Sequence, residues 1–354
     1  MSCLKRWIRD GLSLSQWVIG RLSRRPAVPS VRILVYHSIA AIRPRQDRWR
    51  MSVPPGLFAA QLRWLRQHGY TIVSLGEALE MVRGRRPMPA QAVAVTFDDG
   101  FCDTFQQAYP LLRSQQVPAT VFVVPRYLDA ASPFPWLERP EVFGRPLAWK
   151  ELQQLVSDPL MSVGSHTWSH RQLSDLSIDE QRQEIEQSKV VLEARLGHAV
   201  KWLAYPYGHV DSLTEETIRC LQQAGFEAAC VNVMGVNQVG DSPWVLRRTR
   251  IGWEDCLWRF RLKMTGAYDW VDQWRHQSVR LAHGGRRFGF ASKILWMGMG
   301  LYFFTPSNAY AYIDPGYGSL IWQALLASLF GGLFFARKVI AQAISWIRGK
   351  GGPR

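Results

Sequence analysis

The chain has 354 residues, 47% of them hydrophobic, and a formal net charge of +15. This length allows one large domain or two medium ones with a sizeable core. The basic excess lies at the two ends: residues 1–30 carry six basic and one acidic residue, and residues 271–354 carry ten and two. Residues 31–270 hold 27 basic and 25 acidic residues. A nucleic-acid enzyme would more often carry the excess on its catalytic domain, so we expect no nucleic-acid partner.

Residues 1–30 predict a basic amphipathic helix. Apolar residues recur there at helical spacing with six Lys and Arg around them, and no small-residue cleavage site of a secretory signal precedes Arg21. This pattern is typical of a helix that lies on an anionic membrane surface. A helix packed on the main domain is the alternative.

Strands and helices alternate through residues 31–270. The apolar stretches predict strands at 31–37, 92–97, 119–124, 161–166, 200–206 and 226–232, and helices at 54–70, 104–116, 149–159, 177–197 and 214–225. The longest of these helices begins after Ser177, with Glu180 completing a capping box. Repeated βα units predict a parallel sheet, open or closed as a barrel, with its reactive residues at the carboxyl ends of the strands. Five polar residues fall at such ends, which favours a barrel with one site: His37, Asp98, Asp99, His166 and Tyr207.

The strand at 92–97 ends in two adjacent carboxylates, Asp98 and Asp99. Adjacent acids repel each other, so their presence indicates that one binds a cation while the other transfers protons beside it. His166 and His170 lie four residues apart, and we expect them on one face of a helical turn. Two histidines and a carboxylate are a common catalytic set for a divalent ion. Either aspartate could be the third ligand on spacing alone, with Asp99 the better choice, and the other would act as general base on metal-bound water.

The segments "TFDDG", "SHTWSH" and "LAYPYG" resemble, in order and spacing, three motifs of the polysaccharide deacetylase family (NodB homology, carbohydrate esterase 4). The resemblance covers about residues 31–265 and implies a distorted (β/α)7 barrel that removes N-acetyl groups from an amino sugar with a metal ion. It implies Asp99, His166 and His170 as the metal ligands and Asp98 as the base. It further implies that the Tyr207 backbone N–H holds the oxyanion. In the branch similar to biofilm-polysaccharide deacetylases, the general acid is a histidine after the first strand, which here is His37.

The sequence departs from this family pattern in two places. Ala204 stands where the third motif usually has Arg, so we expect the base to lack that partner. No clear fourth motif follows, and His283, which mimics a late family motif, is interpreted as part of a linker. Four tryptophans are candidates for stacking on sugar rings, with the hydrophobic core as the alternative: Trp136, Trp149, Trp168 and Trp202.

The C-terminal part predicts a transmembrane hairpin over residues 294–347, after a basic linker at 271–293. It contains two uncharged stretches, and a helix needs roughly 20 residues to cross a bilayer. Lys and Arg flank the pair on both outer sides, which places both ends in the cytoplasm. Cleavage after Ala311, at an A-x-A site, is the alternative. Five cysteines without a CxxC pair predict reduced, individually buried thiols, which also favours the cytoplasm.

Together with the family resemblance, which implies a metal-dependent deacetylase, these patterns predict an enzyme at a bacterial inner membrane, with its catalytic domain in the cytoplasm or, alternatively, at the periplasmic face. The expected cofactor is one divalent ion, zinc first, with Co, Ni, Mn or Fe as alternatives. The expected partners are an amino-sugar glycan or a lipid-linked oligosaccharide, the membrane and polysaccharide-synthesis proteins. The alternative functions are a deformylase, another linear or cyclic amide hydrolase, and a non-catalytic sugar-binding or scaffold protein.

Overall fold

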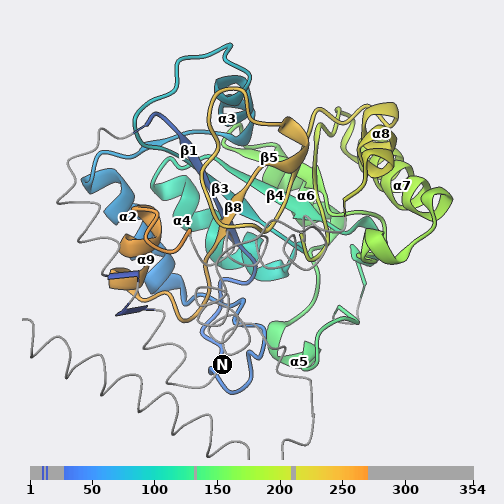
Figure 1. The fold of residues 1–354 in the computed structure, drawn as a ribbon. Coiled ribbons are helices and arrows are strands. Elements are labelled where there is room, and N and C mark those ends of the chain that lie inside the picture. The colour runs from blue at the N-terminus through green and yellow to red at the C-terminus, as the bar shows by residue number, and fades with distance from the viewer. Residues whose placement is uncertain (1–9, 12, 15–27, 131–133, 209–212, 270–354) are drawn as a thin grey trace, which may run out of the picture. The chain divides into compact units, whose positions relative to one another are not determined.

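A computed structural model describes residues 10–11, 13–14, 28–130, 134–208 and 213–269, all within one compact unit that runs from Ser2 to Arg287 (Figure 1). The predicted linker, the transmembrane hairpin, His283 and the Ala311 cleavage site lie outside these residues, as does most of the predicted N-terminal helix. No helix in the described ranges is long and apolar enough to cross a membrane.

The centre of the domain is a parallel sheet that is nearly closed into a barrel. Its order is β7 (Ala228–Cys230), β6 (Trp202–Ala204), β5 (Met161–Ser165), β4 (Ala119–Val123), β3 (Ala92–Phe97), β1 (Val31–Tyr36) and β8 (Arg248–Arg250). A short β2 (Thr71–Ile72) joins the start of β3. A parallel bridge between Cys230 and Leu246 brings the segment before β8 against β7, so the two edges of the sheet meet. The predicted α/β class and parallel sheet are therefore confirmed, in the nearly closed form.

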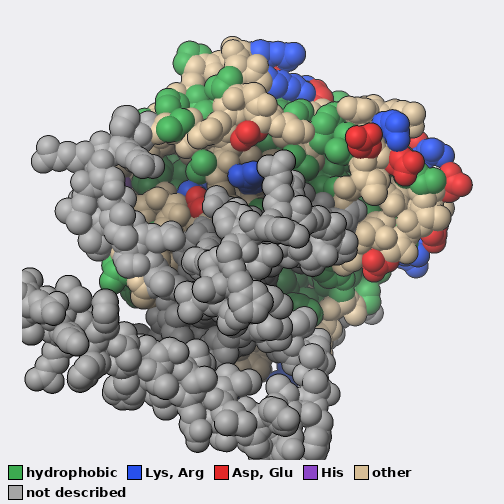
Figure 2. Space-filling model, viewed as in Figure 1, with side chains coloured by type: hydrophobic (Ala, Val, Ile, Leu, Met, Phe, Trp, Pro, Cys, Tyr) green, Lys and Arg blue, Asp and Glu red, His purple; other side chains and the backbone are tan. Residues whose placement is uncertain are grey.

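Helices surround this sheet (Figure 1): α2 (Pro55–Gln67), α3 (Leu75–Val82), α4 (Tyr109–Ser114), α5 (Pro140–Phe143), α6 (Trp149–Val156), α7 (Ile178–Leu196), α8 (Glu215–Gln223) and α9 (Leu257–Met264). Helix α2 packs beside α9, and α7 beside α8. The predicted capping box is present at α7, where the Ser177 side chain accepts from the Glu180 N–H and the Glu180 carboxylate accepts from the Ser177 N–H. Basic and acidic side chains are intermixed over α7 and α8 (Figure 2), as in the pairs Arg182–Asp179 and Lys189–Glu193.

The structure differs from the sequence predictions in three local features. The helix expected at 104–116 begins as a π-helical turn, Thr104–Ala108, and becomes α-helical only at α4; Pro110 lacks the N–H that a regular helix would use there. Strand β8 and helix α9 were not predicted. The sequence of β8 is Arg-Thr-Arg, which has no apolar run to indicate a strand. Cys256 is exposed, although Cys102, Cys220 and Cys230 are free and buried as expected.

The described piece of the predicted N-terminal helix contacts the domain. Asp10 accepts hydrogen bonds from Arg259 at 2.6 Å and from the Tyr268 hydroxyl at 2.7 Å, and Ser13 is buried. These contacts fit the alternative of a helix packed on the domain for this short piece.

Alternation along the strands determines which side chains reach the barrel interior. Val93, Val95 and Phe97 of β3 belong to the cluster that packs under the outer helices, whereas Ala94 belongs to the smaller inner cluster with Phe122 of β4. Because successive residues of a strand point to opposite faces, the inward series of β3 continues past its last residue to Asp98. The same series in β5 runs through Gly164 to His166. The strands therefore aim both motifs at the carboxyl end of the barrel interior.

Gly164 is required where β5 packs against its neighbours. A Cβ at this position would lie 2.4 Å from two ring atoms of Phe122 and 3.0 Å from the backbone oxygen of Trp202. We expect Gly164→Ala to lower the free energy of unfolding by about 1–3 kcal/mol through overpacking, measured by urea denaturation. Gly56→Ala in α2 is the control, since a Cβ there meets nothing within 4 Å; equal losses in both variants would contradict this packing argument.

Candidate active site

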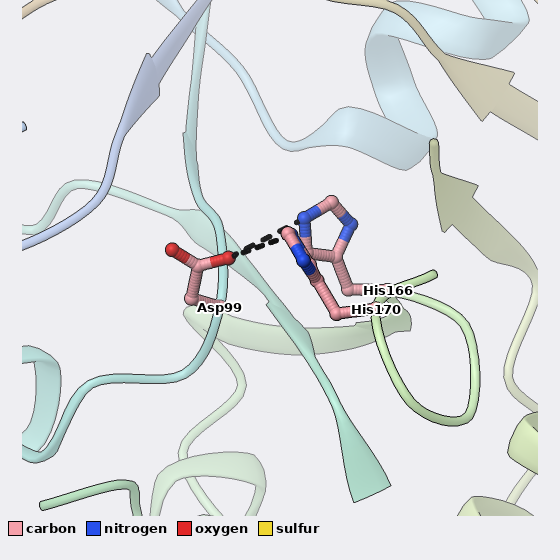
Figure 3. Close-up of side chains that lie close together, drawn as sticks. All are labelled: Asp99, His166 and His170. Atoms are coloured by element: carbon pink, nitrogen blue, oxygen red, sulfur yellow. Dashed lines mark ion pairs between the residues drawn. The ribbon is translucent and has the colours of Figure 1, made fainter. Parts of the chain in front are cut away.

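Three side chains from two loops meet at the carboxyl end of the barrel (Figure 3). The Asp99 Oδ1 lies 3.5 Å from the His166 Nε2 and 3.4 Å from the His170 Nε2. All three residues are buried, and one donor atom from each lies within 4.8 Å of the other two. Asp99 follows β3, and both histidines follow β5. The structure thus brings together the three residues that the sequence proposed as metal ligands.

The two histidines do not lie on a helical turn, so that expectation was wrong. Residues 166–170 form a loop in which Thr167 and His170 have φ values of 62° and 63°. Side chains take the N–H groups that a helix would bond to its own carbonyls: Ser165 Oγ accepts from the Thr167 N–H, and Thr167 Oγ1 accepts from the His170 N–H. The loop therefore converges on Asp99 through a left-handed backbone rather than through helical spacing.

Helix α7 holds this loop from behind. The Glu184 carboxylate accepts the Ser169 N–H at 2.8 Å and the Ser169 hydroxyl, and the Glu184 backbone oxygen accepts the Trp168 N–H at 3.0 Å. Glu184 is itself buried. Sequence reasoning did not identify this anchor, because a glutamate within a long charged helix gives no signal of burial.

The hydrogen bonding of His166 fixes which nitrogen carries its proton. Its Nδ1 lies 2.7 Å from the Ala204 carbonyl oxygen, which can only accept, so Nδ1 is protonated and the Nε2 lone pair faces Asp99. Burial lowers the pKa of His166 to about 4, despite the opposing charge of Asp98, so the ring is neutral at pH 7. A lone pair that faces a carboxylate is repulsive unless a cation lies between them.

Asp99 is ionised in the same place. Burial acts to raise its pKa, but the hydrogen bond with His170 and the charges of His170, His37 and His166 outweigh burial and lower the pKa to about 2. One carboxylate and two imidazoles are a donor set that suits zinc and related divalent ions. The residues present therefore fit the expected metal.

Asp98 does have an arginine partner, which corrects the expectation drawn from Ala204. Arg248, the first residue of β8, donates from Nη1 to Oδ1 and from Nη2 to Oδ2 of Asp98, each at 2.7 Å. Neither side chain is exposed to solvent. Burial acts to raise the pKa of Asp98, but Arg248 outweighs it, so the pKa falls below its ordinary value. Arg248 also donates to the Asn232 side chain at 2.8 Å.

Arg248 is the main residue of the site that sequence reasoning missed. A buried aspartate without a partner indicates that a cation must come from elsewhere in the chain. However, the chain has 43 Lys and Arg, and nothing in a motif distinguishes Arg248 among them.

His37 and Tyr207 also lie at strand ends beside this group. His37 follows β1 and is buried; burial lowers its pKa, while the charges of Asp99 and Asp98 oppose this shift. Tyr207 is 42% exposed, and its ring centroid lies 5.0 Å from that of His170. Tyr207 has a φ of 62°, and its N–H has no hydrogen-bond partner among the described residues.

The tryptophan candidates separate into two groups. Trp136 stacks on His170, with ring centroids 4.0 Å apart and ring planes 16° from parallel. Trp149 and Trp202 pack in the hydrophobic clusters, and Trp168 is half-buried. Among these four tryptophans, Trp136 alone has a ring contact with the triad in the described part of the chain.

Known proteins are similar to this chain in sequence and in fold. Residues 85–229 match the polysaccharide deacetylase family. The chain is 25% identical over 237 residues to YxkH of Bacillus subtilis strain 168, which is named as a polysaccharide deacetylase; the match covers 67% of this chain and 75% of YxkH. It is 31% identical over 130 residues to the poly-beta-1,6-N-acetyl-D-glucosamine N-deacetylase of Escherichia coli K12, covering 35% of this chain and only 19% of that protein.

A solved structure agrees with these relatives. IcaB from Ammonifex degensii superposes with a TM-score of 0.57 at 26% identity, covering 68% of this chain and 97% of that one. The family match includes the segments that carry the buried triad. Residues 85–229, which hold the triad, therefore match a polysaccharide deacetylase domain, and enzymes of this family hydrolyse carbon–nitrogen bonds.

Proposed function

We propose that the chain removes N-acetyl groups from a glycan that contains N-acetylglucosamine, or from its lipid-linked precursor, at a bacterial membrane. The observation that carries this proposal is the buried Asp99–His166–His170 group beside Asp98, which Arg248 holds in its ionised form. The similarity to relatives such as the Escherichia coli poly-beta-1,6-N-acetyl-D-glucosamine N-deacetylase supports the substrate class.

Asp99, His166 and His170 hold the metal in this proposal. When bound there, a divalent ion supplies a Lewis acid for the amide carbonyl and makes water a stronger acid. The residues contribute two imidazole nitrogens and one carboxylate. The carboxylate compensates one of the ion's two positive charges, so the other acts on the substrate.

Asp98 takes the proton from the attacking water. Its two bonds to Arg248 fix the plane of the carboxylate, and each oxygen keeps a second lone pair. The Asp98 Oδ2 lies 4.0 Å from the His166 Nε2, so this oxygen borders the metal ligands. Because Arg248 lowers the pKa of Asp98, the carboxylate stays ionised at every pH at which the domain is expected to work.

Tyr207 and His37 act on the other atoms of the reacting amide. The Tyr207 N–H donates to the developing oxyanion, and the absence of another partner among the described residues leaves it available. The lowered pKa of His37 keeps the ring neutral at pH 7, so it can accept the proton that Asp98 takes from the water and pass it to the leaving amine, which restores both groups.

A non-catalytic sugar-binding or scaffold protein was the alternative from another class. Its ground in the sequence was the missing arginine at position 204. Arg248 supplies that charge from β8, so this ground disappears. Removal of a formyl group uses the same residues and differs only in the acyl group, which an assay with both substrates distinguishes.

The first test removes the base and one metal ligand separately. We expect Asp98→Asn to lower kcat on an N-acetylglucosamine oligomer by about 10²–10⁴-fold, because it removes the proton acceptor. His166→Ala should lose both bound metal and activity. Chelation should inactivate the wild type, and added zinc should restore it. The assay measures acetate release, and undiminished activity in both variants would refute the assignment.

The second test concerns the Arg248–Asp98 pair. In the wild type the lowered pKa of Asp98 stabilises the fold above the pKa of an unfolded aspartate, and this contribution is lost as the pH falls through the lower folded pKa. In Arg248→Met the carboxylate is buried without a partner, which should cost about 3–5 kcal/mol of stability at pH 7. Burial then raises the pKa of Asp98, so the deficit should shrink as the pH falls.

The matched control is the double variant Arg248→Met with Asp98→Asn. It removes both charges, and we expect it to recover most of the stability lost in Arg248→Met at pH 7. Urea denaturation at several pH values measures both effects. A deficit in Arg248→Met that does not change with pH would show that charge burial is not its cause.

Membrane topology is a separate part of the proposal, and the charge pattern around residues 294–347 supports it. We expect a reporter that works only outside the cytoplasm to be inactive at the C-terminus and active when fused near Asp314. A reporter active at the C-terminus and inactive near Asp314 would place the catalytic domain on the opposite face.

A further inference from the structure

The two histidines of the triad are held in different ways. The His166 ring is fixed by the hydrogen bond from its Nδ1 to the Ala204 oxygen. The Nδ1 of His170 is also buried, but it has no hydrogen-bond partner among the described residues. Metal-binding histidines commonly use this second nitrogen to set the orientation of the ring. Something else must therefore orient His170.

The contact that replaces this hydrogen bond is the indole of Trp136. Its ring lies 4.0 Å from the His170 ring and 16° from parallel, and it lies 4.6 Å from the Phe134 ring and 25° from parallel. Rings at these distances and angles lie over a face of the indole. His170 and Phe134 would touch each other if they shared one face, and no such contact occurs among the described rings. The indole therefore lies between them.

The same column of rings leads back to the loop of Asp99. Phe134 meets Phe101 edge to face, with centroids 5.0 Å apart and an angle of 85°. Phe101 lies two residues after Asp99, and both phenylalanines are fully buried. The column His170–Trp136–Phe134–Phe101 thus joins the two loops that carry the metal ligands.

Backbone bonds fix the segment that carries this column. The Leu147 N–H donates to the Gly100 oxygen at 2.9 Å, and the Cys102 N–H donates to the Arg145 oxygen at 3.1 Å. A bridge between Phe101 and Pro146 lies between these bonds. The segment around residues 134–147 is therefore attached directly to the turn that follows Asp99.

We propose that Trp136 is a positioning residue for His170: its indole fixes the imidazole in the orientation that aims Nε2 at the metal site. This inference rests on the proposed metal-binding role of the triad. It also changes the interpretation of Trp136 from the sequence. With both faces of the indole covered, Trp136 cannot stack on a sugar ring.

The experiment measures the zinc dissociation constant of the full-length chain by competition with a chromophoric chelator. We expect Trp136→Ala and Trp136→Leu to weaken zinc binding about 5- to 10-fold, because neither side chain offers an aromatic face. Trp136→Phe restores a ring and should bind zinc nearly as tightly as the wild type. Trp258→Ala is the control for loss of a tryptophan, since Trp258 is 47% exposed on α9, and it should leave the constant unchanged.

Two further readouts separate the alternatives. Assayed at saturating zinc, the Trp136 variants should keep the wild-type KM for the glycan; a raised KM with unchanged zinc affinity would show sugar stacking and overturn the inference. His166→Ala tests the underlying site. If His166→Ala weakens zinc binding and the Trp136 variants do not, the inference about Trp136 fails and the metal site stands. If His166→Ala has no effect on zinc binding, the metal site itself is refuted. If Trp136→Ala does not fold, the zinc affinities of Trp136→Leu and Trp136→Phe decide.

Discussion

The fully buried ion pair between Arg248 and Asp98 is the interaction on which the rest of the site depends. An ionised carboxylate without a partner would be protonated in the barrel interior or would destabilise the fold. Arg248 meets both oxygens of Asp98 at 2.7 Å, which keeps Asp98 charged. The repulsion expected between the adjacent carboxylates is thereby reduced, because Asp98 faces Arg248 and Asp99 faces the two histidines.

The barrel explains how these groups come so close together. Asp98 continues the inward series of β3, but Asp99, the next residue, would point away if the strand continued. Its φ of 70° ends the strand and turns its carboxylate toward His166 and His170. Such strained backbone in a residue other than glycine persists only where surrounding contacts hold it. Here the bond from the Leu147 N–H to the Gly100 oxygen, at 2.9 Å, and the buried Phe101 ring hold the turn that follows Asp99.

The sequence predicted the parallel α/β fold and the three triad residues, because the latter lie in short contiguous motifs at strand ends. It did not predict Arg248 or the place of Trp136. Arg248 lies on a strand of three residues without an apolar run, and its partner is 150 residues away. Trp136 comes from a connecting segment whose position depends on packing against Phe101. The spacing of His166 and His170 indicated a helical turn because four-residue spacing does not distinguish a helix from a left-handed loop.

The most direct measurement is X-ray absorption spectroscopy of the zinc-loaded, full-length chain, together with its metal stoichiometry. The account predicts one zinc ion per chain, with the scattering of two imidazole rings and with oxygen atoms as the remaining ligands. Zinc absent at saturating concentration, or bound by sulfur or without imidazole, would contradict it.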